Sequence, residues 1–152
     1  MKRAQPVCPL TKAKRILVAM DRSKYSEKAF DQAISIAKIC KSTLFVISVI
    51  DLYPEVEEIL IALEEKETVL KGTKKFLEGV KDRAAKENIP CETIVHVGGQ
   101  PHEFIIQEAK EKNIDLIVMG THGRTGLNKL LIGSVAERVV GLAPCAVMVT
   151  PA

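Results

Sequence analysis

The sequence has no tryptophan, few aromatic side chains of any kind and little excess charge. Only 4% of its 152 residues are aromatic, and its formal net charge at pH 7 is +3. Proteins that bind single-stranded nucleic acid stack bases on aromatic rings within a basic groove, and this sequence offers neither feature. It also has no apolar run near the roughly 18 residues that a membrane-spanning helix requires. Nucleic acid and membrane are therefore not expected as partners.

The sequence also lacks cysteines that lie close together. Cys8, Cys40, Cys91 and Cys145 lie far apart without a C-x2-C pair, and with three scattered histidines they show no zinc-site spacing. The last three of these cysteines lie in apolar stretches, so we expect them to be buried, reduced thiols of a cytoplasmic protein. The basic first residues are not followed by the apolar segment of a secretory signal, which favours the same location.

Five short apolar runs alternate with segments of helical period. No hairpin turn of the Asn-Gly type joins two runs, and Pro101 suits the first turn of a helix after the third run. This alternation is typical of a parallel sheet with helices on both faces. The expected strands are residues 15–20, 43–51, 92–97, 115–120 and 145–150.

The strand order follows from the crossovers. The first crossover is expected to go to one side of the first strand and the later ones to the other, which places the first and fourth strands side by side. The predicted fold is therefore α/β, with a five-stranded parallel sheet in the order 3-2-1-4-5. The length fits one domain, which we assign to residues 14–152, after a poorly ordered N-terminal extension over residues 1–13.

The segment between the second and third strands is expected to start irregularly and to become helical. A single helix over 55–87 would be about 50 Å long, whereas a domain of this size is only about 40 Å across. Gly72 and Gly79 each lower helix propensity by about 1 kcal/mol. We therefore predict an irregular part around 54–66 and a helix after it. The residues that share the apolar face of this helix are Thr73, Phe76, Val80 and Ala84.

A glycine-rich stretch, VMGTHGRTGLNKLLIGS (118–134), follows the fourth strand. Gly120, Gly123 and Gly133 have the spacing G-x2-G-x9-G, and Ser134 comes directly after them. In a doubly wound sheet, ligands bind beyond the carboxyl ends of the strands where the strand order reverses. Asp21 and Gly120 leave the first and fourth strands at that point, so the stretch lies where a ligand is expected.

The same stretch has the chemistry of a phosphate cradle. Glycines allow tight turns and bring backbone N–H groups close to an anion. Gly133 and Ser134 precede a helix whose unpaired N–H groups and dipole favour negative charge, and Arg124 and Lys129 lie between the two elements. The motif is neither a P-loop nor a G-x-G-x-x-G fingerprint, which disfavours NAD and the mechanisms of GTPases and kinases.

Several of these residues also have interpretations without a ligand. Ser134 begins an S-x-x-E capping box, which alone favours a helix cap and together with the glycines favours a ligand. Asp21 would cap the approach to the first helix, and Arg124 and Lys129 would be solvated loop charges. His122 would be a loop residue held by a backbone hydrogen bond.

The stretch 118–134 resembles the G-x2-G-x9-G-[ST] motif of the universal stress protein family. ILVAMDRS and FVISVID resemble the first two strands of that family, GQPHEFIIQEAKEKNIDLIVMG its third helix and fourth strand, and PCAVMVT its last strand. The resemblance covers about residues 14–150. It implies a Rossmann-like fold of the adenine nucleotide alpha hydrolase type. Because the motif is complete, it also implies binding of ATP, or of AMP or ADP, with Mg²⁺ or Mn²⁺.

The resemblance also implies a role for each matching residue. Asp21 would contact the ribose or adenine side, Val49 would meet the adenine through its backbone, and Met119 would help to line the pocket. Ala19 stands where the family often has proline or alanine. The residues expected to hold ribose and phosphates are Gly120, Gly123, Arg124, Gly133, Ser134 and the amide of Val135.

These points predict a nucleotide-dependent sensor or regulator in the stress response. No nucleophile–base pair converges near the cradle and Asp21 is the only candidate base, so we assign no catalytic residue and expect at most slow ATP hydrolysis. One alternative is a slow ATPase or an adenylyl-transferring enzyme that uses Asp21 and Mg²⁺. Another is a dimeric interaction scaffold with an empty pocket. The sequence does not indicate the downstream partner.

The last strand, residues 145–150, is expected to form a homodimer. CAVMVT is apolar on both faces, lies at the sheet edge in the predicted order and has no charge or proline to discourage pairing. A second copy in antiparallel orientation would satisfy its free backbone groups in a closed contact. The family resemblance implies the same pairing.

Overall fold

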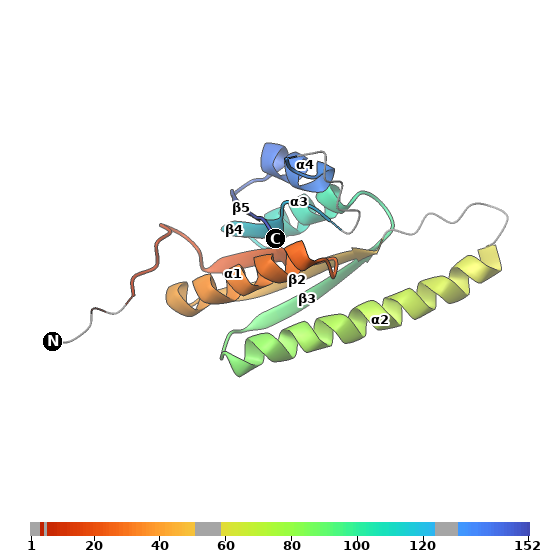
Figure 1. Cartoon of the computed structure of the whole chain (residues 1–152), viewed down its shortest axis with the longest axis horizontal. Coiled ribbons are helices and arrows are strands. Elements are labelled where there is room, and N and C mark those ends of the chain that lie inside the picture. The colour runs from red at the N-terminus through yellow and green to blue at the C-terminus, as the bar shows by residue number, and fades with distance from the viewer. Residues whose placement is uncertain (1–3, 5, 51–58, 124–130) are drawn as a thin grey trace.

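The structure is a computed structural model that describes residue 4 and residues 6–50, 59–123 and 131–152. Strands and helices alternate along the chain (Figure 1). Every predicted strand is confirmed to within one residue at each end. The elements are β1 Arg15–Ala19, α1 Lys24–Cys40, β2 Thr43–Ile50, α2 Ile59–Lys86, β3 Cys91–Val97, α3 Pro101–Glu111, β4 Leu116–Gly120, α4 Ser134–Leu142 and β5 Ala146–Thr150.

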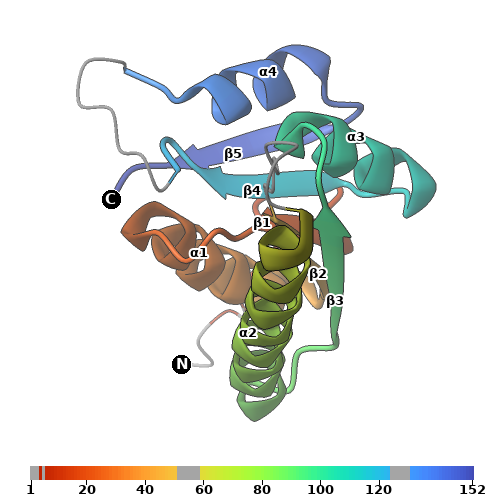
Figure 2. The ribbon, with the colours of Figure 1, turned by 90° about the vertical axis from the view of Figure 1, so that its right-hand side faces the viewer.

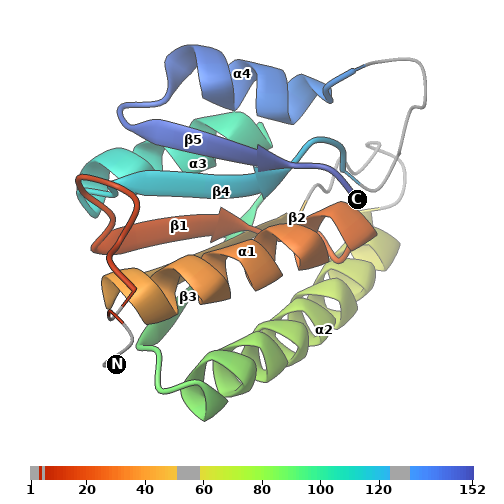
Figure 3. The same ribbon diagram turned by 60° about the vertical axis from the view of Figure 1, so that its left-hand side comes forward.

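The five strands are parallel and have the order β3-β2-β1-β4-β5, which confirms the predicted sheet. β1 is the central strand, and its Leu17 lies opposite Phe45 of β2 and Ile117 of β4. Helices α1 and α2 cover one face of the sheet, and α3 and α4 cover the other (Figures 2 and 3). The strand order reverses between β1 and β4, so the switch point lies at the carboxyl ends of these two strands.

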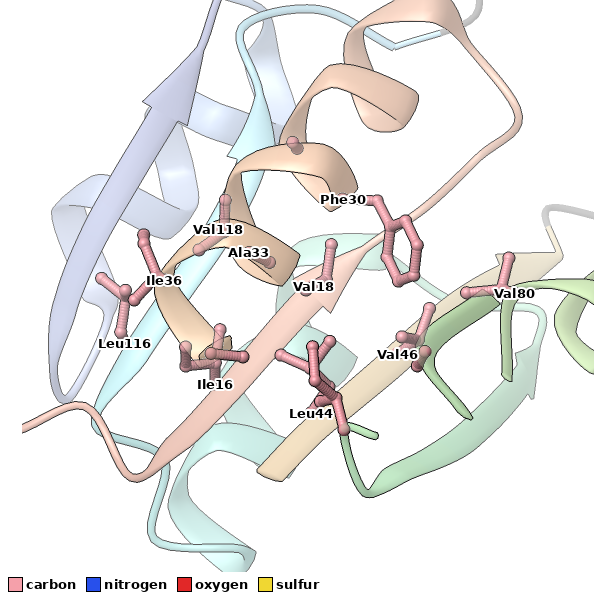
Figure 4. Packing of buried hydrophobic residues seen from close by; sticks show 14 of the residues in the cluster. Ile16, Val18, Phe30, Ala33, Ile36, Leu44, Val46, Val80, Leu116 and Val118 are labelled. Atoms are coloured by element: carbon pink, nitrogen blue, oxygen red, sulfur yellow. The ribbon is translucent and has the colours of Figure 1, made fainter. Parts of the chain in front are cut away.

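Alternation along the strands separates two apolar cores. Ile16 and Val18 of β1 contact the layer of α1 and α2, whereas Leu17 between them contacts the layer of α3 and α4. Figure 4 shows the first core, where Phe30 of α1 and Val80 of α2 meet the strands. Because the side chains of a strand point to opposite faces in turn, a continuous apolar run is what a strand covered on both sides requires.

Helix α2 corrects the prediction for the segment after β2. It begins at Ile59 and has 28 residues, so the part of the predicted irregular segment that is described, residues 59–66, is helical. At 1.5 Å per residue the helix is about 42 Å long. It fits because its first turns extend past the sheet (Figure 1), where Leu63 is 52% exposed. The rest of the prediction, residues 54–58, lies outside the described residues.

The apolar face predicted for the later part of α2 is confirmed. Thr73, Val80 and Ala84 are buried and Phe76 is half-buried, in contact with the first core. The prediction was wrong only at the start of the helix. The width of the domain limits the length of a helix only where the helix packs on the sheet, and the first turns of α2 extend beyond it. No helix among the residues described here is both long and apolar enough to cross a bilayer.

The cysteines correct a second prediction. Cys40, the last residue of α1, forms a disulfide with Cys8, with 4.7 Å between the two Cα atoms. It is therefore not the reduced thiol that the sequence predicted, and the apolar surroundings of Cys40 did not reveal the bond because Cys8 lies 32 residues earlier. Cys91 and Cys145 are free but only half-buried. Burial raises the pKa of the Cys91 thiol to about 11 and also raises that of Cys145.

The segment before β1 contacts the folded domain. Cys8 and Leu10 pack against the first core, and Ala13 is buried in it. The Ser42 hydroxyl, directly before β2, donates a hydrogen bond to the Ala13 carbonyl oxygen. The domain boundary after residue 13 remains a prediction.

Candidate functional site

A cavity of about 250 Å³ opens at the carboxyl ends of β1 and β4, the predicted ligand position. Its walls come from the ends of three strands and from the first turns of α1, α3 and α4. All the predicted site residues that the structure describes line it, whereas Arg124 and Lys129 lie outside the described residues. The predicted residues that line the cavity are Ala19, Asp21, Val49, Met119, Gly120, Gly123, Gly133, Ser134 and Val135.

The cavity has further lining residues that were not predicted from the sequence. Ile47 lies two positions before Val49 on the same face of β2, and Pro101 and Ile105 are one helical turn apart on α3. Strand period and helix period could have added them, because each helix that follows a parallel strand begins at the binding edge. The other lining residues that were not predicted are Met20, Ser26, Thr121, His122 and Ala136.

Asp21 both shapes the loop before α1 and borders the cavity. Its Oδ1 accepts a hydrogen bond from the backbone N–H of Ser23 at 3.0 Å, and Ser23 is the N-cap of α1. Its Oδ2 faces Gly123, where an added Cβ would lie only 3.0 Å away. The carboxylate therefore organises the turn into the helix and stands against the glycine-rich loop across the switch point.

The glycines of the motif allow close approach, and none of the three has a left-handed φ. A Cβ on Gly120 would lie 2.5 Å from the Cβ of Tyr25 and 2.9 Å from its carbonyl carbon. A Cβ on Gly133 would lie 3.0 Å from the carbonyl oxygen of Thr121, which accepts the Gly133 N–H. The chain's own backbone and α1 approach these glycines. Close packing within the chain therefore accounts for Gly120, where the sequence predicts a tight turn, and for Gly133.

The start of α4 corrects the capping-box interpretation of Ser134. The N-cap is Gly133, which has no side chain to cap the helix, and Ser134 is the first helical residue. The Gly133 carbonyl oxygen accepts the N–H of Glu137, so Glu137 comes one position too late for a capping box. The first N–H groups of an α-helix have no acceptor within it, and here they belong to cavity-lining Ser134, Val135 and Ala136.

The cavity has an apolar side and a polar side. Ile47, Val49, Ile105 and Met119 provide aliphatic and thioether surface from β2, α3 and β4. The polar side holds Asp21, the first turn of α4, and His122, whose Nδ1 lies 3.0 Å from the Thr121 hydroxyl and whose ring centroid lies 5.2 Å from that of Tyr25. An apolar surface beside a helix N-terminus suits a ligand that combines an apolar body with a negatively charged group.

Among the described residues that line the cavity, metal ligands do not cluster. Within the part of the chain that the structure describes, no group of three or more His, Cys, Asp or Glu side chains could hold a metal ion. The expectation of Mg²⁺ or Mn²⁺ therefore remains a prediction, in which phosphate oxygens would supply most of the ligands.

Known proteins share both the sequence pattern and the fold. The universal stress protein family model matches residues 12–151. This chain belongs to that family. It is 40% identical over 147 residues to the universal stress protein MJ0531 of Methanocaldococcus jannaschii, covering 90% of this chain and 81% of the relative. It is 34% identical over 150 residues to the universal stress protein YxiE of Bacillus subtilis, covering 89% and 97% of the two chains.

Solved structures have the same fold. The structure of the protein MJ0577 superposes with a TM-score of 0.84 at 29% identity, covering 91% of this chain and 96% of that one. More distant structures contain nucleotides: one universal stress protein is in complex with cAMP (TM-score 0.66, 24% identity, 90% and 96% coverage), and one family protein from Arabidopsis thaliana has AMP bound (TM-score 0.65, 18% identity, 91% and 91% coverage). At these identities the likeness to the two complexes establishes the fold alone.

Proposed function

We propose that this universal stress protein binds an adenine nucleotide in the cavity between β1 and β4 and acts as a nucleotide-dependent sensor or regulator. The observation that carries the proposal is that the apolar side of the cavity and the N-terminus of α4 line the same volume of about 250 Å³. An adenine ring suits the apolar side, and the phosphates suit the first N–H groups of the helix. The nucleotides bound by two distant structural relatives have the same chemistry.

Different lining residues of the cavity are proposed to contact different parts of the nucleotide. The adenine lies against Val49, Met119 and Ile105, with the Val49 backbone at its edge, and Asp21 accepts a hydrogen bond from the ribose. The N–H groups of Ser134 and Val135 hold the phosphates. ATP adds charge that these groups offset only in part, so Mg²⁺ or Mn²⁺ is expected with ATP and not with AMP.

A regulator fits this site better than an enzyme does. A phosphoryl-transfer enzyme needs a base that accepts a proton from the attacking group. In this proposal the Asp21 carboxylate is engaged by the ribose and by the Ser23 N–H, the latter shaping the loop before α1. We therefore expect slow hydrolysis at most. The enzyme alternative predicts that Asp21→Asn lowers turnover more than it lowers ATP affinity.

Calorimetry with adenosine, AMP and ATP tests the proposal directly. AMP is expected to bind more tightly than adenosine because only AMP reaches the α4 N-terminus. Chelation of divalent cations is expected to weaken ATP binding and to leave AMP binding unchanged. Absence of binding by all three ligands, with no nucleotide released from the purified protein on denaturation, would leave the empty scaffold as the remaining function.

A homodimer through β5 is part of the proposal. β5 pairs only with β4 among the described strands, and Val140 and Leu142 of the adjacent α4 are 51% and 61% exposed. Val147 and Val149 face the second core, so lysines there would damage the fold. Val140→Lys combined with Leu142→Lys is expected to give a monomer, whereas Leu63→Lys, equally exposed on α2, is the control. Light scattering gives the molar mass of the unmutated protein, the double variant and the control. A monomeric unmutated protein would exclude the dimer.

A further inference from the structure

Arg22 lies next to the cavity in a conformation that non-glycine residues rarely adopt. It stands between Asp21, which lines the cavity, and the helix cap Ser23, and its φ is 67°. The hydrogen bond from the Ser23 N–H to Asp21 Oδ1 closes the turn around it. A left-handed conformation at a residue with a long side chain is unfavourable unless other contacts hold it.

Those contacts come from α2. The Arg22 guanidinium donates a hydrogen bond of 3.5 Å to the hydroxyl of Thr73, which is buried, and its central carbon lies 5.2 Å from the centroid of the Phe76 ring. At Gly72 an added Cβ would lie 3.6 Å from the Arg22 Nη2 atom. Gly72, Thr73 and Phe76 together form what we call the arginine seat. None of the three lines the cavity.

The two glycines of α2 differ in their surroundings. A Cβ on Gly79 would meet nothing within 4 Å, whereas the one described atom near a Cβ on Gly72 belongs to Arg22. Glycine inside a helix is unfavourable compared with almost any other residue. At Gly72 a Cβ would be in ordinary contact with the guanidinium and a larger side chain would occupy its place, whereas a Cβ on Gly79 would reach no described neighbour.

We propose that Arg22 is a positioning residue for the nucleotide: its contact with the arginine seat fixes the Asp21 loop against α2. This inference rests on the proposed function. A loop that is already fixed loses less conformational entropy when a ligand binds, so the contact raises nucleotide affinity without touching the nucleotide. By thermodynamic reciprocity, nucleotide binding stabilises the seat on α2.

A double-mutant cycle tests the coupling. Arg22→Gly keeps the left-handed backbone without strain and removes the guanidinium, and Gly72→Leu fills the seat from α2. Each is expected to weaken AMP binding about fivefold, and Gly72→Leu is expected to have no further effect in the Arg22→Gly background, because both changes remove one contact. Gly79→Leu is the matched control: it makes the same change in the same helix and is expected to leave AMP affinity unchanged in both backgrounds.

Hydrogen exchange gives a second measurement that does not depend on Gly72→Leu folding. AMP is expected to slow amide exchange around residues 70–76 in the unmutated protein and not in Arg22→Gly. Equal affinities of Gly72→Leu and Gly79→Leu, or equal protection of the seat in Arg22→Gly, would overturn the inference alone. An unmutated protein that binds no adenine nucleotide would overturn the proposed function and this inference with it.

Discussion

The two ends of the sheet use their polar groups in opposite ways. At the binding end, where the carboxyl ends of the strands lie, the first turns of α1, α3 and α4 surround a cavity. At the opposite end, polar groups are paired within the chain. Asp115 Oδ2 accepts the N–H groups of Lys14 and Arg15, each at 3.0 Å, and the Cys8–Cys40 disulfide ties the segment before β1 to the end of α1.

This difference separates stability from binding. The opposite end closes the domain, and changes there are expected to alter the free energy of unfolding and to leave nucleotide affinity unchanged. At the binding end the first residues of α4 line the cavity, so some changes there are expected to alter nucleotide affinity and to leave the free energy of unfolding nearly unchanged. A single change should alter both the free energy of unfolding and the nucleotide affinity only where one residue contributes to both. Gly120 is such a residue.

The largest effect is expected from the disulfide. A bond that closes a loop of 32 residues stabilises a protein by about 3–4 kcal/mol in the chain-entropy account. Cys8→Ser with Cys40→Ala is therefore expected to lower the free energy of unfolding by that amount, measured by urea denaturation, with unchanged AMP affinity. Cys91→Ala is the control for loss of a free thiol. Equal urea midpoints for the unmutated protein with and without reductant would contradict this prediction.

Gly120→Ala is expected to cost nearly as much and to affect both properties. Its Cβ would lie 2.5 Å from that of Tyr25, so α1 must move away from β4, at about 3 kcal/mol for overpacking. The same movement displaces the loop of Asp21 and weakens AMP binding. Gly141→Ala is the matched control, because a Cβ there meets nothing within 4 Å and its helix gains propensity. An unchanged free energy of unfolding for Gly120→Ala would contradict the close packing of α1 on β4 described here.

Asp115→Ala is expected to have an intermediate effect on stability alone. The Asp115 side chain is 6% exposed and accepts the N–H groups of Lys14, which is exposed, and Arg15, which is half-buried. Its loss removes two hydrogen bonds to a charged acceptor and is expected to cost about 2 kcal/mol. Asp115→Asn retains an acceptor oxygen and is expected to cost less. Thermal unfolding and AMP calorimetry on both variants measure the two properties. A change in AMP affinity would show that the two ends are coupled.

Ser134→Pro is expected to have the smallest effect on stability and a clear effect on binding. Proline suits the first position of a helix, so the free energy of unfolding changes by no more than about 0.5 kcal/mol. The variant removes one N–H group from the cavity, and AMP affinity is expected to fall about tenfold while adenosine affinity stays the same. Ser134→Ala, which removes only the hydroxyl, separates the two donors. Equal losses for adenosine and AMP would place the phosphate elsewhere.

Much of the binding end could be predicted from the sequence because its signals are local. Apolar runs gave the strands, the crossover rule gave their order, and the order placed Asp21 beside Gly120. What could not be predicted is what each glycine contacts. Gly120 and Gly133 looked like residues that make room for a ligand, but Tyr25 and Thr121 are the groups that approach them.

The sequence by itself determined the parallel sheet, its strand order and the place of the cavity. Apolar runs and helical period depend on short stretches of chain, and the crossover rule then orders the strands. Only the tertiary structure decided the partners of residues far apart: Cys8 with Cys40, and Arg22 with Gly72 and Thr73. It also decided that α2 continues past the sheet from Ile59. Such pairings depend on how whole elements lie in space, and no pattern within a single element encodes them.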